Sequence, residues 1–241
     1  MTRTFKVLSA LLTYPTAEMQ AALPELAAAI KQEALLPVAV GRQLDLLLSE
    51  IATGDLYDLQ ERYVLLFDRT RSLSLHLFEH VHGESRDRGQ AMIDLKTVYE
   101  NGGLEIDATE LPDFVPLFLE FLSTRPRPEA YDLLAQPAHV FAAMAERLRK
   151  RQSAYEAVFR ALVQLAATKP KADVVSALLA EPDPDADDLA ALDAAWVDEA
   201  VQFGPGASSD CKDTLIEKIR AGRRPAPGMP QVQARPVMPR S

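Results

Sequence analysis

The sequence predicts an all-α protein, a single-domain helical bundle with a flexible C-terminal tail. Three observations lead to this fold class. Hydrophobic residues make up 48% of the 241 residues, and Ala and Leu, which favour helices, dominate them. Apolar residues recur every three or four positions along most of the chain, and no segment alternates as a strand does. Gly is scarce at 10 residues, and several of the 17 Pro separate one apolar stripe from the next.

Four helices are expected in the first 67 residues. Breaks fall at Tyr14-Pro15 and Leu36-Pro37, because a residue that precedes proline avoids the helical region, and a further break falls at Thr53-Gly54. Thr16 can cap the second helix through its side-chain oxygen. The four apolar stripes are Phe5/Leu8/Leu11/Leu12, Met19/Leu23/Leu26/Ile30, Val40/Leu44/Leu47/Leu48/Ile51 and Leu56/Leu59/Tyr63/Leu66/Phe67.

More helices are expected after residue 72. Asn101-Gly102-Gly103 is a strong helix stop, and Asp113 begins a helix that tolerates Pro116 in its first turn. Arg125-Pro126-Arg127-Pro128 is a rigid break, and Ser153 with Glu156 has the form of a capping box. The expected helices are 73–81, 88–99, 113–122, 129–136, 138–151, 153–168 and 173–180.

Composition divides the chain into four parts: a helical domain (1–180), an acidic linker (181–188), a short docking segment (189–211) and a disordered, basic, Pro-rich tail (212–241). Residues 181–199 hold eight acids and no base, whereas the tail has seven bases, two acids and five prolines. Trp196 is expected to pack the segment after the linker against the body.

Charge and cysteine content narrow the function. A net charge of −9 disfavours binding to nucleic acid and suits a cationic peptide partner. Cys211 is the only cysteine, so nothing implies an oxidising compartment. The apolar run near the N-terminus is short and lacks a cleavage site, and no segment approaches about 20 apolar residues. We therefore expect a cytoplasmic protein without stable membrane association.

The run from Leu65 to Gly89 contains three of the four histidines. If residues 73–81 are helical, His76 and His80 share a face, and such pairs can hold zinc beside a carboxylate such as Glu79. The hydrolytic motif requires Glu directly after the first His, but Leu77 occupies that position. No metal and no cofactor are expected. The histidines can instead cap helix ends and pair with carboxylates and backbone groups, or they can edge a surface that receives an amphipathic peptide.

Three runs resemble the NarJ-type nitrate reductase assembly chaperones, within the wider TorD/DmsD group of redox-enzyme maturation proteins. The runs, hereafter the signature runs, are ERYVLLFDR (residues 61–69), LHLFEHVHGESRDRGQAM (75–92) and ELPDFVPLFLEFL (110–122). The resemblance implies a helical bundle that is not an enzyme. It also implies binding to the N-terminal leader of the apo catalytic (alpha) subunit of respiratory nitrate reductase. Such chaperones support molybdenum cofactor insertion and delay membrane attachment, and cofactor delivery proteins are further expected partners.

The resemblance directs attention to twelve candidate peptide-binding residues. Apolar side chains would form the wall of the binding surface, acidic side chains would meet the leader's basic groups, and histidines would make affinity depend on pH. Arg86 completes the set. The wall is Tyr63, Leu66, Phe67, Leu75 and Phe78; the acids are Glu61, Glu79 and Glu84; the histidines are His76, His80 and His82.

Three other functions remain open from the sequence. A metal-dependent enzyme would use His76, Glu79 and His80. A nucleotide-binding regulator is a second alternative, although no phosphate-binding loop is present. A chaperone for another molybdoenzyme of the same group, such as a dimethyl sulfoxide or trimethylamine oxide reductase, is the third.

Overall fold

The computed structural model describes residues 2–81, 86–106, 110–181 and 183, and this part of the chain is all-α, as predicted. It contains no strand apart from an isolated β-bridge. The predicted docking segment and tail lie outside the described residues. The helices are α1 (Arg3–Leu11), α2 (Ala17–Glu33), α3 (Val38–Thr53), α4 (Leu56–Tyr63), α5 (Arg86–Asn101), α6 (Val115–Thr124), α7 (Arg127–Leu134), α8 (Ala138–Lys150), α9 (Glu156–Leu165) and α10 (Ala172–Ala180).

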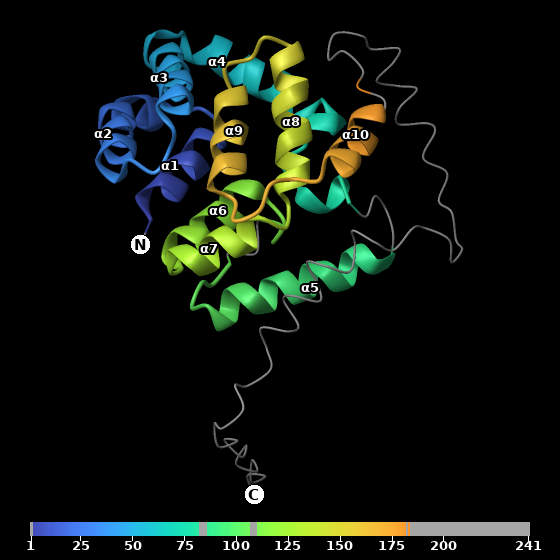
Figure 1. Cartoon of the computed structure of the whole chain (residues 1–241). Coiled ribbons are helices and arrows are strands. Elements are labelled where there is room, and N and C mark those ends of the chain that lie inside the picture. Colours follow the sequence, from blue (N-terminus) through green and yellow to red (C-terminus); the bar gives the residue numbers. More distant parts are fainter. Residues whose placement is uncertain (1, 82–85, 107–109, 182, 184–241) are drawn as a thin grey trace, which may run out of the picture.

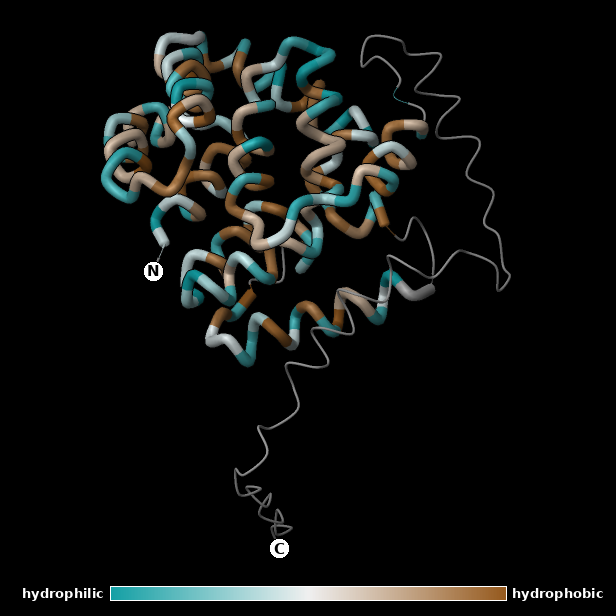
Figure 2. Tube along the Cα trace, in the orientation of Figure 1, coloured by the Kyte–Doolittle hydropathy of each residue, from teal (hydrophilic) through white to brown (hydrophobic). Residues whose placement is uncertain are grey.

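The helices pack around one hydrophobic core (Figure 1). Helix α1 packs against α2 and α6, while α9 lies between α3 and α8, and α10 covers the other side of α8. Helix α5 runs along one end of the bundle. Phe5, Leu8, Leu11 and Leu12 are fully buried, so the first predicted stripe lies in the centre. Figure 2 shows hydrophobic and hydrophilic residues following one another along the helices at the spacing of a turn.

Several predicted helix ends are confirmed. The Thr16 hydroxyl accepts a hydrogen bond from the Met19 amide at 3.2 Å and caps α2. Helix α5 ends where Gly103 adopts a φ of +80°, and the Leu104 amide then donates to the Tyr99 carbonyl at 2.9 Å. This is the Schellman arrangement that a glycine just past the helix end makes possible. Pro116 lies in the first turn of α6, as expected.

The fourth stripe is not a single α-helix. Helix α4 ends at Tyr63, and the chain continues as a π-helical turn, η1 (Val64–Asp68). The Arg69 amide donates to the Val64 carbonyl at 2.9 Å, five residues back, and the Thr70 hydroxyl donates to the Leu65 carbonyl at 2.7 Å. These bonds widen the last turn, so Leu66 and Phe67 still enter the core.

The prediction of a helix over residues 73–81 is wrong. The segment has only the short 3₁₀ turns η2 (Arg71–Leu73) and η3 (Leu77–Glu79). Its backbone bonds instead to the connection that precedes α6: the Leu77 amide donates to the Asp113 carbonyl at 3.1 Å, and the Val115 amide donates to the Leu75 carbonyl at 2.8 Å. These long-range partners replace the local bonds that a helix would need.

Three helix starts also differ from the prediction. Helix α6 begins at Val115, because Asp113 serves as a buried bonding partner and not as a cap. Helix α7 begins at Arg127, so Pro128 lies within its first turn. The capping box at Ser153 does not form: the Glu156 amide donates to the Ser153 carbonyl, and the Ser153 hydroxyl has no hydrogen-bond partner in the described part of the chain. No helix among the described residues is both long and apolar enough to cross a bilayer.

Candidate functional site

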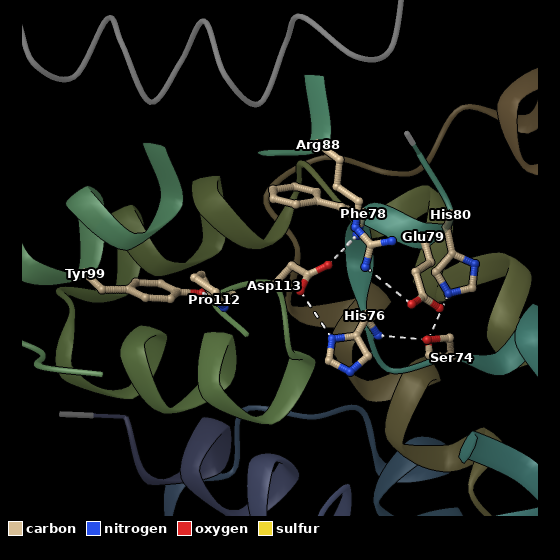
Figure 3. Close-up of polar contacts among 9 residues, drawn as sticks. All are labelled: Ser74, His76, Phe78, Glu79, His80, Arg88, Tyr99, Pro112 and Asp113. Carbon is tan, nitrogen blue, oxygen red and sulfur yellow. Dashed lines mark hydrogen bonds and ion pairs between the residues drawn. The ribbon is translucent and has the colours of Figure 1, made fainter. Parts of the chain in front are cut away.

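Asp113 organises the candidate site, which joins two of the signature runs (Figure 3). Its side chain is fully buried. One carboxylate oxygen accepts the Phe78 amide at 3.0 Å, and the other lies 3.2 Å from Nδ1 of His76. A buried carboxylate is costly without such partners, so the residue 75–81 segment and Asp113 stabilise one another.

His76 lies between this buried carboxylate and the surface. Its backbone forms a β-bridge with Phe114, and its ring lies 5.4 Å from the Phe114 ring. The hydrogen bond to Asp113 raises the pKa of His76, although burial acts in the opposite direction. The side chain remains 29% exposed. The raised pKa favours the protonated, positively charged form of His76 at the edge of the site.

His80 has a different environment from His76. Its Nε2 lies 2.8 Å from the Ser74 carbonyl, which can only accept, so Nε2 carries the proton. Burial lowers the pKa of His80, and the hydrogen bond to Ser74 offsets that effect in part. His80 is therefore a neutral structural group that closes the turn. Its ring holds the turn that displays Glu79.

Charged groups form the outer edge of the site. The Arg88 guanidinium of α5 lies 3.3 Å from the Glu79 carboxylate, and the two side chains are 25% and 28% exposed. Tyr99 of α5 donates its hydroxyl to the Pro112 carbonyl at 2.8 Å, and burial raises the pKa of that phenol, which stays protonated. Helix α5, the 75–81 segment and the third signature run are thus held together. We call His76, Glu79 and Arg88 the charged edge.

The predicted apolar wall lies inside the core. Each of its five side chains is at most 8% exposed: Tyr63, Leu66, Phe67, Leu75 and Phe78. Tyr63 also donates its hydroxyl to the Leu12 carbonyl at 3.0 Å. No peptide can touch these side chains unless the segments that carry them move. Their role in peptide binding stays a prediction.

The other predicted residues are scattered. Glu61 is exposed on α4, and Arg86 is the first residue of α5. His82 and Glu84 lie outside the described residues. The expectation that His76 and His80 share a helix face is wrong, because their segment is not helical. Among residues 2–81, 86–106, 110–181 and 183, no group of three or more His, Cys, Asp or Glu side chains is arranged to hold a metal ion.

Two important groups escaped the sequence analysis. Asp113 is the single acid in the apolar stretch 111–119, and that isolation was the available signal. Arg147 is only 1% exposed and donates to the Ser72 carbonyl at 2.9 Å and the Leu178 carbonyl at 2.6 Å. It lies within the basic last turn of α8 and gives no sequence signal of its burial.

We expect Asp113→Ala to lower the free energy of unfolding by about 3 kcal/mol, because the buried Phe78 amide loses its acceptor and His76 its partner. Urea denaturation measures the change. Asp132→Ala, at an exposed position on α7, is the matched control and should change stability by less than about 0.5 kcal/mol. Equal stabilities of the two variants would contradict the role given to Asp113.

The pKa of His76 should lie above the ordinary histidine value of 6.5, and the pKa of His80 should lie below it. The His76 contribution to stability is complete below pH 6.5 and is lost as the pH rises through the raised pKa. The His80 contribution is present above pH 6.5 and is lost as the pH falls through the lowered pKa. NMR titration of the ring protons checks both. In the Asp113→Asn variant the pKa of His76 should fall, because the negative charge beside the ring is lost. An unchanged pKa would contradict the hydrogen bond between His76 and Asp113.

The nitrate reductase delta subunit family matches residues 14–161, which include most of the bundle and all three signature runs. The nitrate reductase molybdenum cofactor assembly chaperone NarJ of Escherichia coli strain K12 is 42% identical over 210 residues, which cover 87% of this chain and 88% of that protein. NarW of the same strain is 39% identical, covering 89% of this chain and 90% of NarW. NarJ of Bacillus subtilis strain 168 is 32% identical, covering 66% of this chain and 86% of that protein.

These matches confirm the resemblance that the signature runs predicted. They span most of the described bundle and extend beyond any single motif. The chain belongs to the nitrate reductase delta subunit family, which also includes the NarJ-type assembly chaperones.

Proposed function

We propose that this chain is an assembly chaperone of respiratory nitrate reductase and has no catalytic activity of its own. It binds the N-terminal leader of the cofactor-free catalytic subunit in the cytoplasm. While bound, it keeps the subunit open to insertion of the molybdenum cofactor and delays its attachment to the membrane. Proteins that deliver the cofactor would meet the subunit in this complex.

The charged edge is the observation that carries the proposal. The Glu79 side chain is part-exposed and forms an ion pair with Arg88, whose guanidinium nitrogen lies 3.3 Å from a Glu79 carboxylate oxygen. A leader arginine can take the place of Arg88, because a carboxylate accepts two parallel bonds from a guanidinium. The chain's net charge of −9 also attracts a cationic peptide over a longer range.

A partly apolar surface of this chain lies beside the charged edge and can contact apolar side chains of the leader. Leu111 is 47% exposed, and Phe114 is partly buried with its ring against His76. A peptide that lies along the charged edge can place apolar side chains on both without disturbing the core. For Leu75 and Phe78 of the predicted wall to take part, the 75–81 segment would have to separate from Asp113. Leader binding would then cost the bonds that Asp113 makes.

Loss of the Glu79 charge should weaken leader binding. We expect Glu79→Gln to raise the dissociation constant for a synthetic leader peptide about fivefold, which corresponds to about 1 kcal/mol for a part-exposed ion pair. Calorimetry measures the constant, and the difference should shrink as salt is added. Glu129→Gln, an exposed acid on α7, is the matched control. Equal affinities of the two variants would exclude Glu79 from the binding surface.

The cellular role predicts a specific captured protein. Tagged chain purified from cells without molybdenum cofactor should retain the nitrate reductase catalytic subunit, because insertion cannot finish and release is delayed. A subunit that lacks its leader should be absent from the same purification. Retention of a dimethyl sulfoxide or trimethylamine oxide reductase instead would favour another molybdoenzyme as the client. Stoichiometric metal in the purified chain would favour the metal-dependent alternative.

A further inference from the structure

Asp68 of the first signature run has an exposed carboxylate that forms no ion pair with an arginine or lysine in the described part of the chain. It is the last residue of the π-helical turn η1. The protein around it removes part of its water, and this desolvation raises the pKa of Asp68, although the nearby His76 opposes the rise. A partly desolvated carboxylate without a cationic partner favours binding of a cation from outside.

The wide turn η1 fixes the position of Asp68. The Arg69 amide bonds to the Val64 carbonyl, and the Thr70 hydroxyl bonds back into the same turn. Just before Asp68, the Phe67 ring packs against two tyrosine rings in the core. The backbone on both sides of Asp68 is therefore held, and a ligand meets a carboxylate that does not have to be ordered first.

Asp68 lies next to the charged edge. Its charge interacts with His76, and the charges of Glu79 and Arg88 act on the ring of the same histidine. Arg88 pairs with Glu79 and leaves Asp68 without a partner of its own among the described arginines and lysines. A peptide bound at the charged edge is thus within reach of a second carboxylate.

Aromatic, apolar and acidic side chains surround Tyr63 on the far side of Asp68. Burial raises the pKa of the Tyr63 phenol, and the nearby charges of Asp68 and Glu110 add to the rise. The exposed ring of Tyr14 meets the Tyr63 ring edge-on, at a centroid distance of 5.6 Å. Leu111, directly after Glu110, is exposed as well. This surface can bind cationic and apolar side chains of one peptide together.

We propose that the leader-binding surface continues from the charged edge to Asp68, and that Asp68 binds a second basic group of the leader. Tyr14 and Leu111 contact the apolar side chains beside that group. This inference rests on the proposed function and adds a requirement to it, because the leader must carry one base for Glu79 and another for Asp68. The first base competes with Arg88, whereas the second displaces no arginine or lysine of the described chain.

Loss of the Asp68 charge tests the second contact. We expect Asp68→Asn to raise the dissociation constant for a synthetic leader peptide about fivefold in calorimetry, as for the loss of one part-exposed ion pair. The fold should be unaffected, because the exposed Asp68 side chain makes no hydrogen bond in the described part of the chain. Asp132→Asn, at an exposed position on α7, is the matched control and should bind the peptide like the unsubstituted chain.

Peptides in which each basic residue is replaced in turn by glutamine identify the partner of each acid. One replacement should weaken binding about fivefold with the unsubstituted chain and have no further effect with Asp68→Asn, because both changes remove the same contact. A different replacement should show this non-additivity with Glu79→Gln.

The outcomes separate this inference from the proposed function. Binding that is weakened by Glu79→Gln but not by Asp68→Asn would overturn the inference and leave the proposed function standing. Non-additivity of both acids with the same leader base would show a single basic contact and would also overturn it. An unsubstituted chain that does not bind the leader peptide would contradict the proposed function, and the inference with it.

Discussion

The burial of the Asp113 carboxylate is the constraint on which the candidate site depends. A charge without solvent must be matched by donors, and here the donors come from a segment 37 residues earlier in the chain. Phe78 contributes a backbone amide and His76 a ring nitrogen. Residues 74–81 form no α-helix because these bonds replace helical ones. One acid thus fixes the relative positions of two signature runs.

Arg147 is a second buried charged residue that joins distant segments, and its charge is positive. Its guanidinium joins the Ser72 carbonyl at η2 to the Leu178 carbonyl near the end of α10. Desolvation lowers the pKa of this arginine, and the nearby Asp183 and Glu181 charges oppose the change. Both buried charges therefore hold connections between helices, whereas the helices themselves rest on ordinary apolar packing. The connections also carry the part-exposed side chains of His76 and Glu79.

Much of the fold follows from local sequence. The three- and four-residue spacing of apolar side chains places nearly every helix, and short-range chemistry at Thr16 and Gly103 places their ends. The family was also recognisable, because the signature runs are contiguous. Among the candidate site residues, His76 and Glu79 were identified and lie on the charged edge. Arg88 lay within the quoted runs but was not selected, because nothing local tells which arginine faces Glu79.

What the sequence could not supply depends on contacts between distant residues. The stripe ending at Phe67 and the run from 73 to 81 both have helical spacing, yet one ends in a π-turn and the other is not helical. Apolar spacing indicates that Tyr63, Leu66 and Phe78 have a common environment, but it does not distinguish a core from an exposed groove. The sequence by itself determined the helices, their breaks and the family. Only the tertiary structure decided that the side chains of the predicted wall lie in the core and that the buried Asp113 bonds to His76 and the Phe78 amide. The physical reason is that long-range hydrogen bonds to a desolvated carboxylate outweigh local helical preference.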